Sequence, residues 1–403
     1  MKDQDFPSLE FDKRIARLAR EAARKRLDAF LVYTEANRLY FTGFQSSNGI
    51  LVVEADGVGE ADGVGEADGV GEADGVGEAD GVGETDRVGR AGREPEFYTD
   101  FRYIEMARQS VGSARVRLLG DLPRQFGPLA KRRKWRRVGY EGEISTIRHK
   151  SFREAMPGIE EWVEAQEAIV RLRAVKSRAE QAAVRRAARI ADEVYRQTIA
   201  EVRVGMTEWD IRRILRRWVD CLDAEGEAFD SIVSVGSNSS KPHAKVTRRV
   251  LRRGQPLLID MGVRMGRYCS DMTRTVFVGG PSKKMRSIYG IVQAAQLKAL
   301  EAVRAGRRCC DVDAAARKYI AKRGYGRFFG HGLGHAIGLS VHEPPALNAK
   351  TKDRLRSGMI VTIEPGIYLP GIGGVRIEDT VIVRPDGCEI LTRTPRDLTV
   401  LEG

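Results

Sequence analysis

Two apolar, β-prone segments of this 403-residue chain fold back on themselves, and each carries a pair of acidic residues. In PLLIDMGVRMGRYCSDMTRTVFV (256–278), Asp260 and Asp271 are equally far from a turn at about 264–267, so antiparallel pairing places them side by side. In MIVTIEPGIYLPGIGGVRIEDTVIV (359–383), Glu364 and Glu378 are equally far from Gly371. Carboxylates in such apolar surroundings are destabilising unless a cation lies between them. The sequence therefore predicts two hairpins whose acidic pairs share a cation.

The same four carboxylates predict a site for two metal ions and a hydrolytic reaction. Together they carry about four negative charges, which two divalent cations would neutralise. The segment GHGLGHAIGLSVHEPP (330–345) holds three of the chain's five histidines and is the available source of a nitrogen ligand. One imidazole among oxygen ligands suits Mn²⁺, Co²⁺ or Fe²⁺ and does not exclude Zn²⁺. Such a metal pair acidifies a water molecule and polarises a carbonyl group, which is the chemistry of hydrolysis.

A hexapeptide repeat separates two expected hairpin strands, GILVVE (49–54) and EFYTD (96–100). EADGVG occurs five times from Glu54 and is followed by ETDRVG. A β-helix built from it would have one valine per turn, and calcium-binding repeats need a longer unit with paired glycines. Low hydrophobicity and frequent glycine instead favour a flexible, low-complexity insertion at about 54–90, without a catalytic role.

The charge pattern argues against a nucleic-acid partner, and the cysteine content indicates the cellular compartment. The net charge is +12, but 56 acidic residues are interspersed with 68 basic ones, and the only dense basic cluster is KRRKWRR (131–137). This pattern favours a solvated arginine-rich surface over nucleic-acid binding. No apolar run reaches the roughly 18–20 residues of a membrane span, and the first residues are charged. Five cysteines without CxxC spacing indicate free thiols, so we expect a soluble, cytoplasmic protein.

The pattern along the chain predicts two domains with an α+β catalytic part. A composition shift near 164–171 places the boundary so that residues 1–165 and 166–403 form separate domains. Thr207 is expected to cap a helix, with Asp210 three residues on. After that helix we expect strands and turns. The other expected elements are helices at 11–27 and about 160–199 and strands at 29–33 and 137–142.

Five motifs, in order, resemble the metal-ligand signatures of the pita-bread-fold metallopeptidases, the family of aminopeptidase P, prolidase and methionine aminopeptidase. They are LLIDMG, SDMTRT, GHGLGHAIGLSVHEPP, TIEPGIY and GVRIEDT, and the resemblance is detailed from about Arg171 onward. More loosely, YFTGF and FYTDFRY resemble the creatinase-type N-terminal domain. The resemblance implies a creatinase-like α/β domain at 1–165 and a pita-bread catalytic domain at 166–403.

When the family's metal ligands are matched to positions of this sequence, the resemblance implies five ligands for two metal ions. Asp260 would bind one ion, His335 and Glu364 the second, and Asp271 and Glu378 would bridge the two. Glu364 would also be the general acid and base. The implied cofactor is two divalent ions per chain, with Mn²⁺ expected and Co²⁺ or Zn²⁺ as alternatives.

Further residues match positions that contact substrate in the family. His331 and His342 would bind substrate and stabilise the tetrahedral intermediate, and His243 in SVGSNSSKPHAKV would lie in the substrate pocket. Tyr368 and Arg376 fall where proline-specific members place pocket residues. Taken alone, Arg376 is equally a structural partner for the carboxylates, and Tyr368 a core aromatic.

The creatinase-like domain and the wording VHEPP and IEPGIY favour an Xaa-Pro peptidase over a methionine aminopeptidase. We expect an Xaa-Pro aminopeptidase that acts on small peptides with proline in the second position, as a homodimer. The alternative is an Xaa-Pro dipeptidase of the prolidase type, or a metal-dependent hydrolase or lyase of a small non-peptide substrate. Relatives that act as metal-free amidinohydrolases, or as binding modules, lose the ligand set. Its retention here argues against both.

Overall fold

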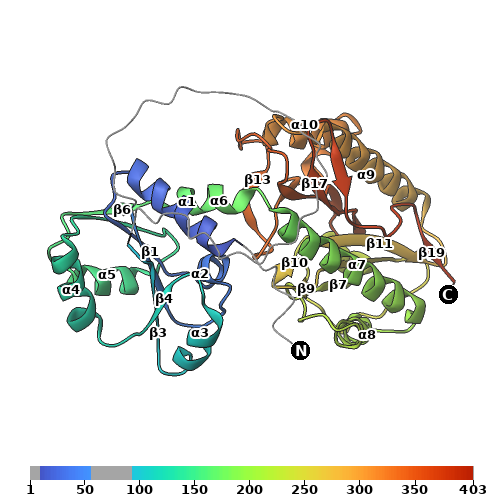
Figure 1. Ribbon diagram of the computed structural model, residues 1–403. Helices are drawn as coiled ribbons and strands as arrows, with labels where there is room; N and C mark the ends of the chain where they lie inside the picture. The colour runs from blue at the N-terminus through green and yellow to red at the C-terminus, as the bar shows by residue number, and fades with distance from the viewer. Residues whose placement is uncertain (1–9, 56–92, 403) are drawn as a thin grey trace, which may run out of the picture. The chain divides into compact units, whose positions relative to one another are not determined.

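The computed structural model describes residues 10–55 and 93–402 (Figure 1). These residues form two compact units, Glu10–Ile169 and the described residues from Val170 onward. Apart from Glu54 and Ala55, the repeat predicted as a flexible insertion lies outside the described residues. The predicted boundary between residues 165 and 166 stays a proposal.

The N-terminal unit is built on one six-stranded mixed sheet with the order β4-β3-β2-β1-β5-β6. β2 and β3 pair antiparallel, as the hairpin prediction requires. β1 lies between β2 and β5 and pairs antiparallel with β2 and parallel with β5. The strands are β1 (Ala29–Val32), β2 (Ile50–Glu54), β3 (Glu96–Thr99), β4 (Arg115–Leu118), β5 (Arg137–Tyr140) and β6 (Glu161–Glu164).

Helices pack on this sheet through alternating strand residues. Phe126 of α4 and Phe152 of α5 share a buried cluster with Leu31, Val52 and Tyr98. Because neighbouring residues of a strand face opposite sides, Phe30, Leu51 and Phe97 lie on the other face, and α1 contacts β1 and β2. The helices are α1 (Phe11–Arg24), α2 (Glu35–Thr42), α3 (Ile104–Ser110), α4 (Leu122–Arg133) and α5 (Thr146–Ala155).

The prediction of one long helix over 160–199 is wrong in two places. Residues 161–164 form β6 because they pair with β5 at the sheet edge, and this tertiary pairing overrides local helix propensity. The helical part is then divided into α6 (Gln166–Ala174) and α7 (Arg178–Glu201). Ser177 begins α7 by accepting a hydrogen bond from the backbone N–H of Glu180, whose side chain accepts one from Ser177 in return.

The C-terminal unit contains two sheets and two short ribbons. One sheet has the order β19-β11-β8-β7, and the other β13-β12-β14-β17-β18. The first comprises β7 (Ile232–Val235), β8 (Pro256–Met261), β11 (Met272–Val278) and β19 (Val400–Leu401). The second comprises β12 (Gly334–Ala336), β13 (Glu343–Leu347), β14 (Ile360–Ile363), β17 (Asp379–Val383) and β18 (Cys388–Ile390). The ribbons are β9 (Arg264–Met265) with β10 (Tyr268–Cys269), and β15 (Gly366–Leu369) with β16 (Gly373–Arg376).

A pair of helices covers each of these sheets (Figure 1). α7 and α8 (Glu208–Cys221) share one buried cluster with β7, β8 and β11, while α9 (Lys283–Ala302) and α10 (Cys309–Lys322) share another with β14 and β17. Thr207 and Asp210 form the predicted capping box of α8. The expectation of strands and turns beyond α8 is wrong for α9 and α10, whose apolar faces are buried in the core.

Among the helices that the structure describes, none combines the length and apolar character needed to cross a bilayer.

Candidate metal centre

The predicted ligands come from ends and edges of strands in both sheets of the C-terminal unit. Asp260 lies in β8 and Asp271 directly precedes β11, whereas Glu364 directly follows β14 and Glu378 directly precedes β17. His335 is the middle residue of β12. β11 contacts β17, so the two sheets meet where these side chains lie.

The register of the first hairpin differs from the prediction. Asp260 pairs with Thr273 rather than with Asp271. The turn is centred on Gly266 and Arg267, which both have positive φ, one residue later than the midpoint used in the prediction. Shifting a turn centre by one residue moves each cross-strand partner by two. Asp271 still approaches the other acids because it lies just before β11, where the chain bends into the strand.

The register of the second hairpin is as predicted. Gly366 pairs with Arg376 and Ile363 with Asp379, so Glu364 and Glu378 occupy opposite positions about Gly371. Neither acid belongs to a ladder pair. Both lie at the step between the sheet and the β15–β16 ribbon, where side chains leave the regular strand geometry.

Asp271, His335 and Glu378 each offer a ligand atom within 4.8 Å of the other two. His335 Nε2 lies 3.6 Å from Asp271 Oδ2 and 3.5 Å from Glu364 Oε1. Its Nδ1 lies 3.1 Å from the carbonyl oxygen of Ala336, which leaves Nε2 facing the carboxylates. This is an arrangement in which a neutral imidazole and several acids can bind one cation together.

Burial and mutual repulsion act on the acids of this cluster. Burial, followed by Glu378, Asp260 and Glu364, raises the pKa of Asp271 well above its usual value. Burial and then Glu378 likewise raise the pKa of Glu364, and burial and then Asp260 raise that of Glu378 to about 8. At neutral pH the Glu378 carboxyl therefore holds a proton unless a cation replaces it.

The donor set fits a divalent metal. Asp260 Oδ1 is buried and has no hydrogen-bond partner among the residues described, which is costly for a carboxylate oxygen without a cation. Burial, and then the charge of His342, lower the pKa of His335 to about 4, so its imidazole is neutral and free to bind metal. Oxygen ligands from acids with one imidazole suit Mn²⁺, Co²⁺, Fe²⁺ or Zn²⁺.

Four of the five predicted substrate-pocket residues lie around this cluster. His331 Nε2 is 2.9 Å from the Tyr368 hydroxyl, which accepts a hydrogen bond of 2.9 Å from Arg376. Arg376 also forms a buried ion pair with Asp260. The rings of His342 and His335 are 4.3 Å apart. Burial and then the charge of Arg376 lower the pKa of His331 to about 4. The fifth residue, His243, is exposed in the loop before β8 and makes a smaller contribution to the same shift.

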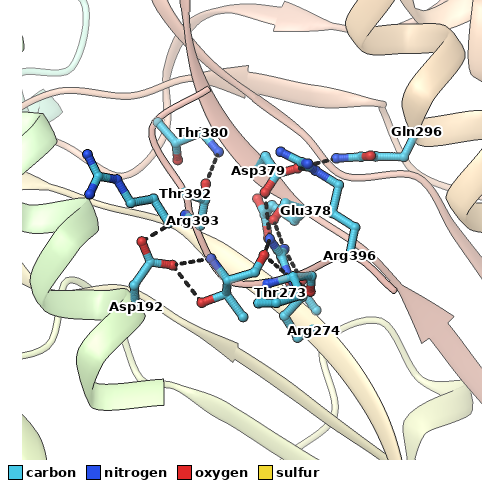
Figure 2. Close-up of polar contacts among 12 residues, drawn as sticks. Asp192, Thr273, Arg274, Gln296, Glu378, Asp379, Thr380, Thr392, Arg393 and Arg396 are labelled. Carbon is cyan, nitrogen blue, oxygen red and sulfur yellow. Dashed lines mark hydrogen bonds and ion pairs between the residues drawn. The ribbon is translucent and has the colours of Figure 1, made fainter. Parts of the chain in front are cut away.

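Three supporting side chains were not anticipated. Thr273 donates a 2.6 Å hydrogen bond to Glu378 Oε2 and accepts one from Arg376 (Figure 2 shows Thr273 beside Glu378). Thr362 Oγ1 accepts a hydrogen bond of 3.1 Å from the backbone N–H of His335. Arg317 donates to the carbonyl of His331 at 2.6 Å. The threonines of SDMTRT and VTIEPG were visible signals, whereas Arg317 lies in a helix without a motif.

Gly334 is required for the close approach of β12 and β14. A Cβ atom at Gly334 would lie 2.0 Å from the carbonyl oxygen of Thr362, whereas one at Gly330 would meet nothing within 4 Å. We therefore expect Gly334→Ala to lower the free energy of unfolding by about 3 kcal/mol and Gly330→Ala by no more than about 0.5 kcal/mol. Urea unfolding of both variants measures this difference. Equal stabilities would contradict the predicted clash.

The metal-free protein is expected to lose stability between about pH 6.5 and 8. Unfolding returns raised carboxyl pKa values, including that of Glu378 at about 8, to their usual range, so in this window the folded state holds protons that the unfolded state has released. The lowered pKa values of His331 and His335, about 4 in the folded state, make stability rise with pH, but only below the unfolded histidine pKa of 6.5. Stability therefore falls with rising pH, by about 1–2 kcal/mol.

Chemical unfolding at pH 6.5 and 8 in the presence of a chelator measures this slope. Glu378→Gln is the control, since removing the titrating group should flatten it. A metal-free protein that is more stable at pH 8 than at pH 6.5 would contradict the assignment.

Comparison with known proteins agrees with this architecture. Metallopeptidase family M24 matches residues 182–385, and the creatinase/prolidase N-terminal domain matches residues 14–61 and 88–175. An Xaa-Pro dipeptidase of Pyrococcus furiosus is 38% identical over 261 residues, which cover 65% of this chain and 75% of that protein.

Two solved structures resemble nearly the whole chain. The Xaa-Pro dipeptidase of Bacillus anthracis has a TM-score of 0.84 at 31% identity, covering 97% of this chain and 100% of that one. The X-Pro aminopeptidase of Thermotoga maritima has a TM-score of 0.78 at 31% identity, covering 94% and 100%. These matches confirm the predicted fold class, a creatinase-like N-terminal domain followed by a pita-bread catalytic domain. The chain belongs to metallopeptidase family M24 and is a hydrolase of that family.

Proposed function

We propose that this protein is a metal-dependent exopeptidase that hydrolyses the bond between an N-terminal residue and proline. The observation that carries this proposal is the meeting of four carboxylates and a neutral imidazole beside the His331–Tyr368–Arg376 chain of hydrogen bonds. Proline has no amide N–H and a fixed φ, so its bond needs a dedicated pocket. The named dipeptidase and aminopeptidase relatives support this substrate class.

Two divalent ions would be held by the predicted ligands, with Mn²⁺ as the proposed metal. Asp260 would bind one ion, His335 and Glu364 the other, and Asp271 and Glu378 would bridge them. When bound, the ions would polarise the scissile carbonyl and make a water molecule acidic enough to attack it. The buried acid cluster supports this assignment.

The chain's own residues would move the proton and hold the substrate. Glu364 would accept a proton from the attacking water and deliver it to the proline nitrogen as the peptide bond breaks. His331 and His342 would contact the substrate and stabilise the tetrahedral intermediate. Tyr368 would orient His331, with which it shares a hydrogen bond, and Arg376 would hold Asp260 in place. His243 would contact the substrate from its exposed loop.

Of the two subtypes, we propose the dipeptidase as the main activity and the aminopeptidase, which was the first expectation from the sequence, as the second candidate. Curated relatives named Xaa-Pro dipeptidase are 38% and 40% identical over 65% and 60% of this chain, which supports the dipeptidase. We also propose a cytoplasmic homodimer. All five cysteines lie in described residues and are free thiols, which supports a reducing compartment.

A substrate panel tests the proposal. The chelator-treated protein is reloaded with Mn²⁺, Co²⁺ or Zn²⁺ and given Ala-Pro, Ala-Pro-Ala and Met-Ala, with Asp271→Ala as the inactive control. We expect metal-dependent cleavage of the proline peptides only, and faster cleavage of the dipeptide. Faster cleavage of the tripeptide would reverse the subtype. Metal binding without cleavage of any peptide would overturn the peptidase proposal in favour of a small non-peptide substrate.

A further inference from the structure

A cavity of about 530 Å³ lies in the C-terminal unit outside the candidate metal centre. Its walls come from α7, β11, the first half of α9 and the segment 393–399. Neutral and apolar side chains form most of the lining, among them Ile199, Val276, Tyr289 and Pro395. This volume and mixed lining are those of a typical small-molecule site, and none of the predicted ligands or pocket residues borders it.

Among the residues described, the acidic side chains around the cavity have hydrogen-bond partners in the protein, whereas two of its arginine side chains do not. Asp192 accepts hydrogen bonds from the backbone N–H groups of Arg393 and Thr394, each at 2.8 Å (Figure 2). Glu193 pairs with Arg196. By contrast, the guanidinium groups of Arg189 and Arg393 form no ion pair or hydrogen bond within residues 10–55 and 93–402. The third acid of the lining, Asp397, accepts a hydrogen bond of 3.0 Å from the side-chain amide of Gln293. Each acid of the lining thus has a hydrogen-bond donor from the protein, while the guanidinium groups of Arg189 and Arg393 remain for a ligand.

The inner wall also holds a polar group without a partner. Tyr195 is 6% exposed, and its buried hydroxyl has no hydrogen-bond partner in the part of the chain that the structure describes. A buried hydroxyl left without a partner costs about 1–3 kcal/mol.

We propose that this cavity binds a small organic anion, with an apolar body against Ile199, Val276 and Tyr289 and a carboxylate or similar group beside Arg189 and Arg393. The lining selects this class because it offers apolar side chains and because its two charged groups without a hydrogen-bond partner in the described residues are the guanidinium groups of Arg189 and Arg393. A cation would be repelled by the two arginines, and a fully apolar molecule would pair with neither of them.

The same segment that closes the cavity also touches the back of the metal centre. Arg274, which is buried, donates to the carbonyls of Thr394 at 2.6 Å and Pro395 at 3.0 Å, and also to the backbone carbonyl of Glu378 (Figure 2). Its guanidinium pairs with Asp379 at 2.7 Å. Arg396, which belongs to the segment itself, also pairs with Asp379. A ligand that holds residues 393–399 thus acts through Arg274 and Arg396 on the chain at Glu378, a predicted bridging ligand, and the site is regulatory.

Fluorescence of anilinonaphthalene sulfonate, an aromatic anion, tests binding in the full chain. We expect saturable binding of one probe per chain that is lost in Ile199→Trp, which fills the cavity. Arg393→Glu should weaken binding by about fivefold because it reverses a charge at the rim. Arg304→Glu, an exposed arginine of the same unit outside the lining, should leave it unchanged. Equal binding by all four proteins would overturn the proposal.

Competition identifies the ligand class, and kinetics tests regulation. Octanoate should displace the probe and octylamine should not, so equal displacement by both would overturn the anion assignment. Octanoate should also change kcat/KM for Ala-Pro in the wild type by at least about threefold and leave Ile199→Trp unchanged. The same response in both proteins would overturn regulation through this cavity. Probe binding is measured without substrate, so its failure is distinct from failure of the proposed peptidase activity.

Discussion

Replacing Glu364 by Gln is expected to lower kcat for Xaa-Pro hydrolysis by about 10²–10⁴-fold. The amide keeps the size of the side chain but cannot accept the proton of the attacking water. Burial and then the charge of Glu378 raise the pKa of Glu364, which suits it to accept a proton. The Nε2 atom of the neutral His335 lies 3.5 Å from its Oε1 atom. Steady-state kinetics with a proline peptide measures the loss, and metal analysis of the same sample separates lost proton transfer from lost metal.

A matched control is Glu389→Gln, in the same unit. Glu389 pairs with Arg185 and Arg384 away from the acid cluster, so its neutralisation should leave kcat within about twofold of the wild type. If Glu364→Gln retained full metal content and a kcat within threefold of the wild type, Glu364 would not be the proton acceptor.

The second large expected effect concerns Asp271→Asn. This substitution should stabilise the protein without metal and destabilise it, relative to the wild type, when metal is bound. Without metal, Asp271 is a buried carboxyl surrounded by Glu378, Asp260 and Glu364. An asparagine removes this repulsion, so the metal-free variant should be more stable than the metal-free wild type by about 1–2 kcal/mol. With metal at about 100 times its Kd, the wild type should gain about 2.7 kcal/mol and the variant much less.

Thermal unfolding with chelator and with Mn²⁺ measures both differences. Asp386→Asn, an exposed acid in the loop between β17 and β18, is the control and should change stability by less than about 0.5 kcal/mol in either condition. A variant that is less stable than the wild type without metal would contradict the repulsion on which the metal site rests.

The arrangement of the candidate site shows where reasoning from spacing succeeds. Glu364 and Glu378 are separated by a short ribbon whose turn, near Gly371, is unambiguous, so their register follows from the sequence. Asp260 and Asp271 flank a turn with several glycine and arginine positions, and placing its centre one residue early gives the wrong partner. Local spacing thus predicts which hairpins form more reliably than it predicts their register.

Helices α9 and α10 illustrate the converse. At the start of α10, Arg308 makes no side-chain capping bond, so the sequence offers no cap signal there. At the start of α9, Ser282 accepts a hydrogen bond from the backbone N–H of Met285, a signal that the sequence contained and the prediction did not use. The apolar residues of both helices are buried against strands far away in the sequence. β6 was mistaken for helix because its partner β5 lies far enough along the chain that no local signal announces the pairing.

The sequence by itself determined the family, the two acidic hairpins and the identity of the side chains that meet between them, because ligand types and their spacing along strands are local properties. Only the tertiary structure decided that Asp260 pairs with Arg376, 116 residues away, and that Arg274 links residues 394–395 to Glu378. Such contacts join segments that belong to different sheets or lie outside them. Their distances depend on how the sheets pack, which no periodicity within one segment specifies.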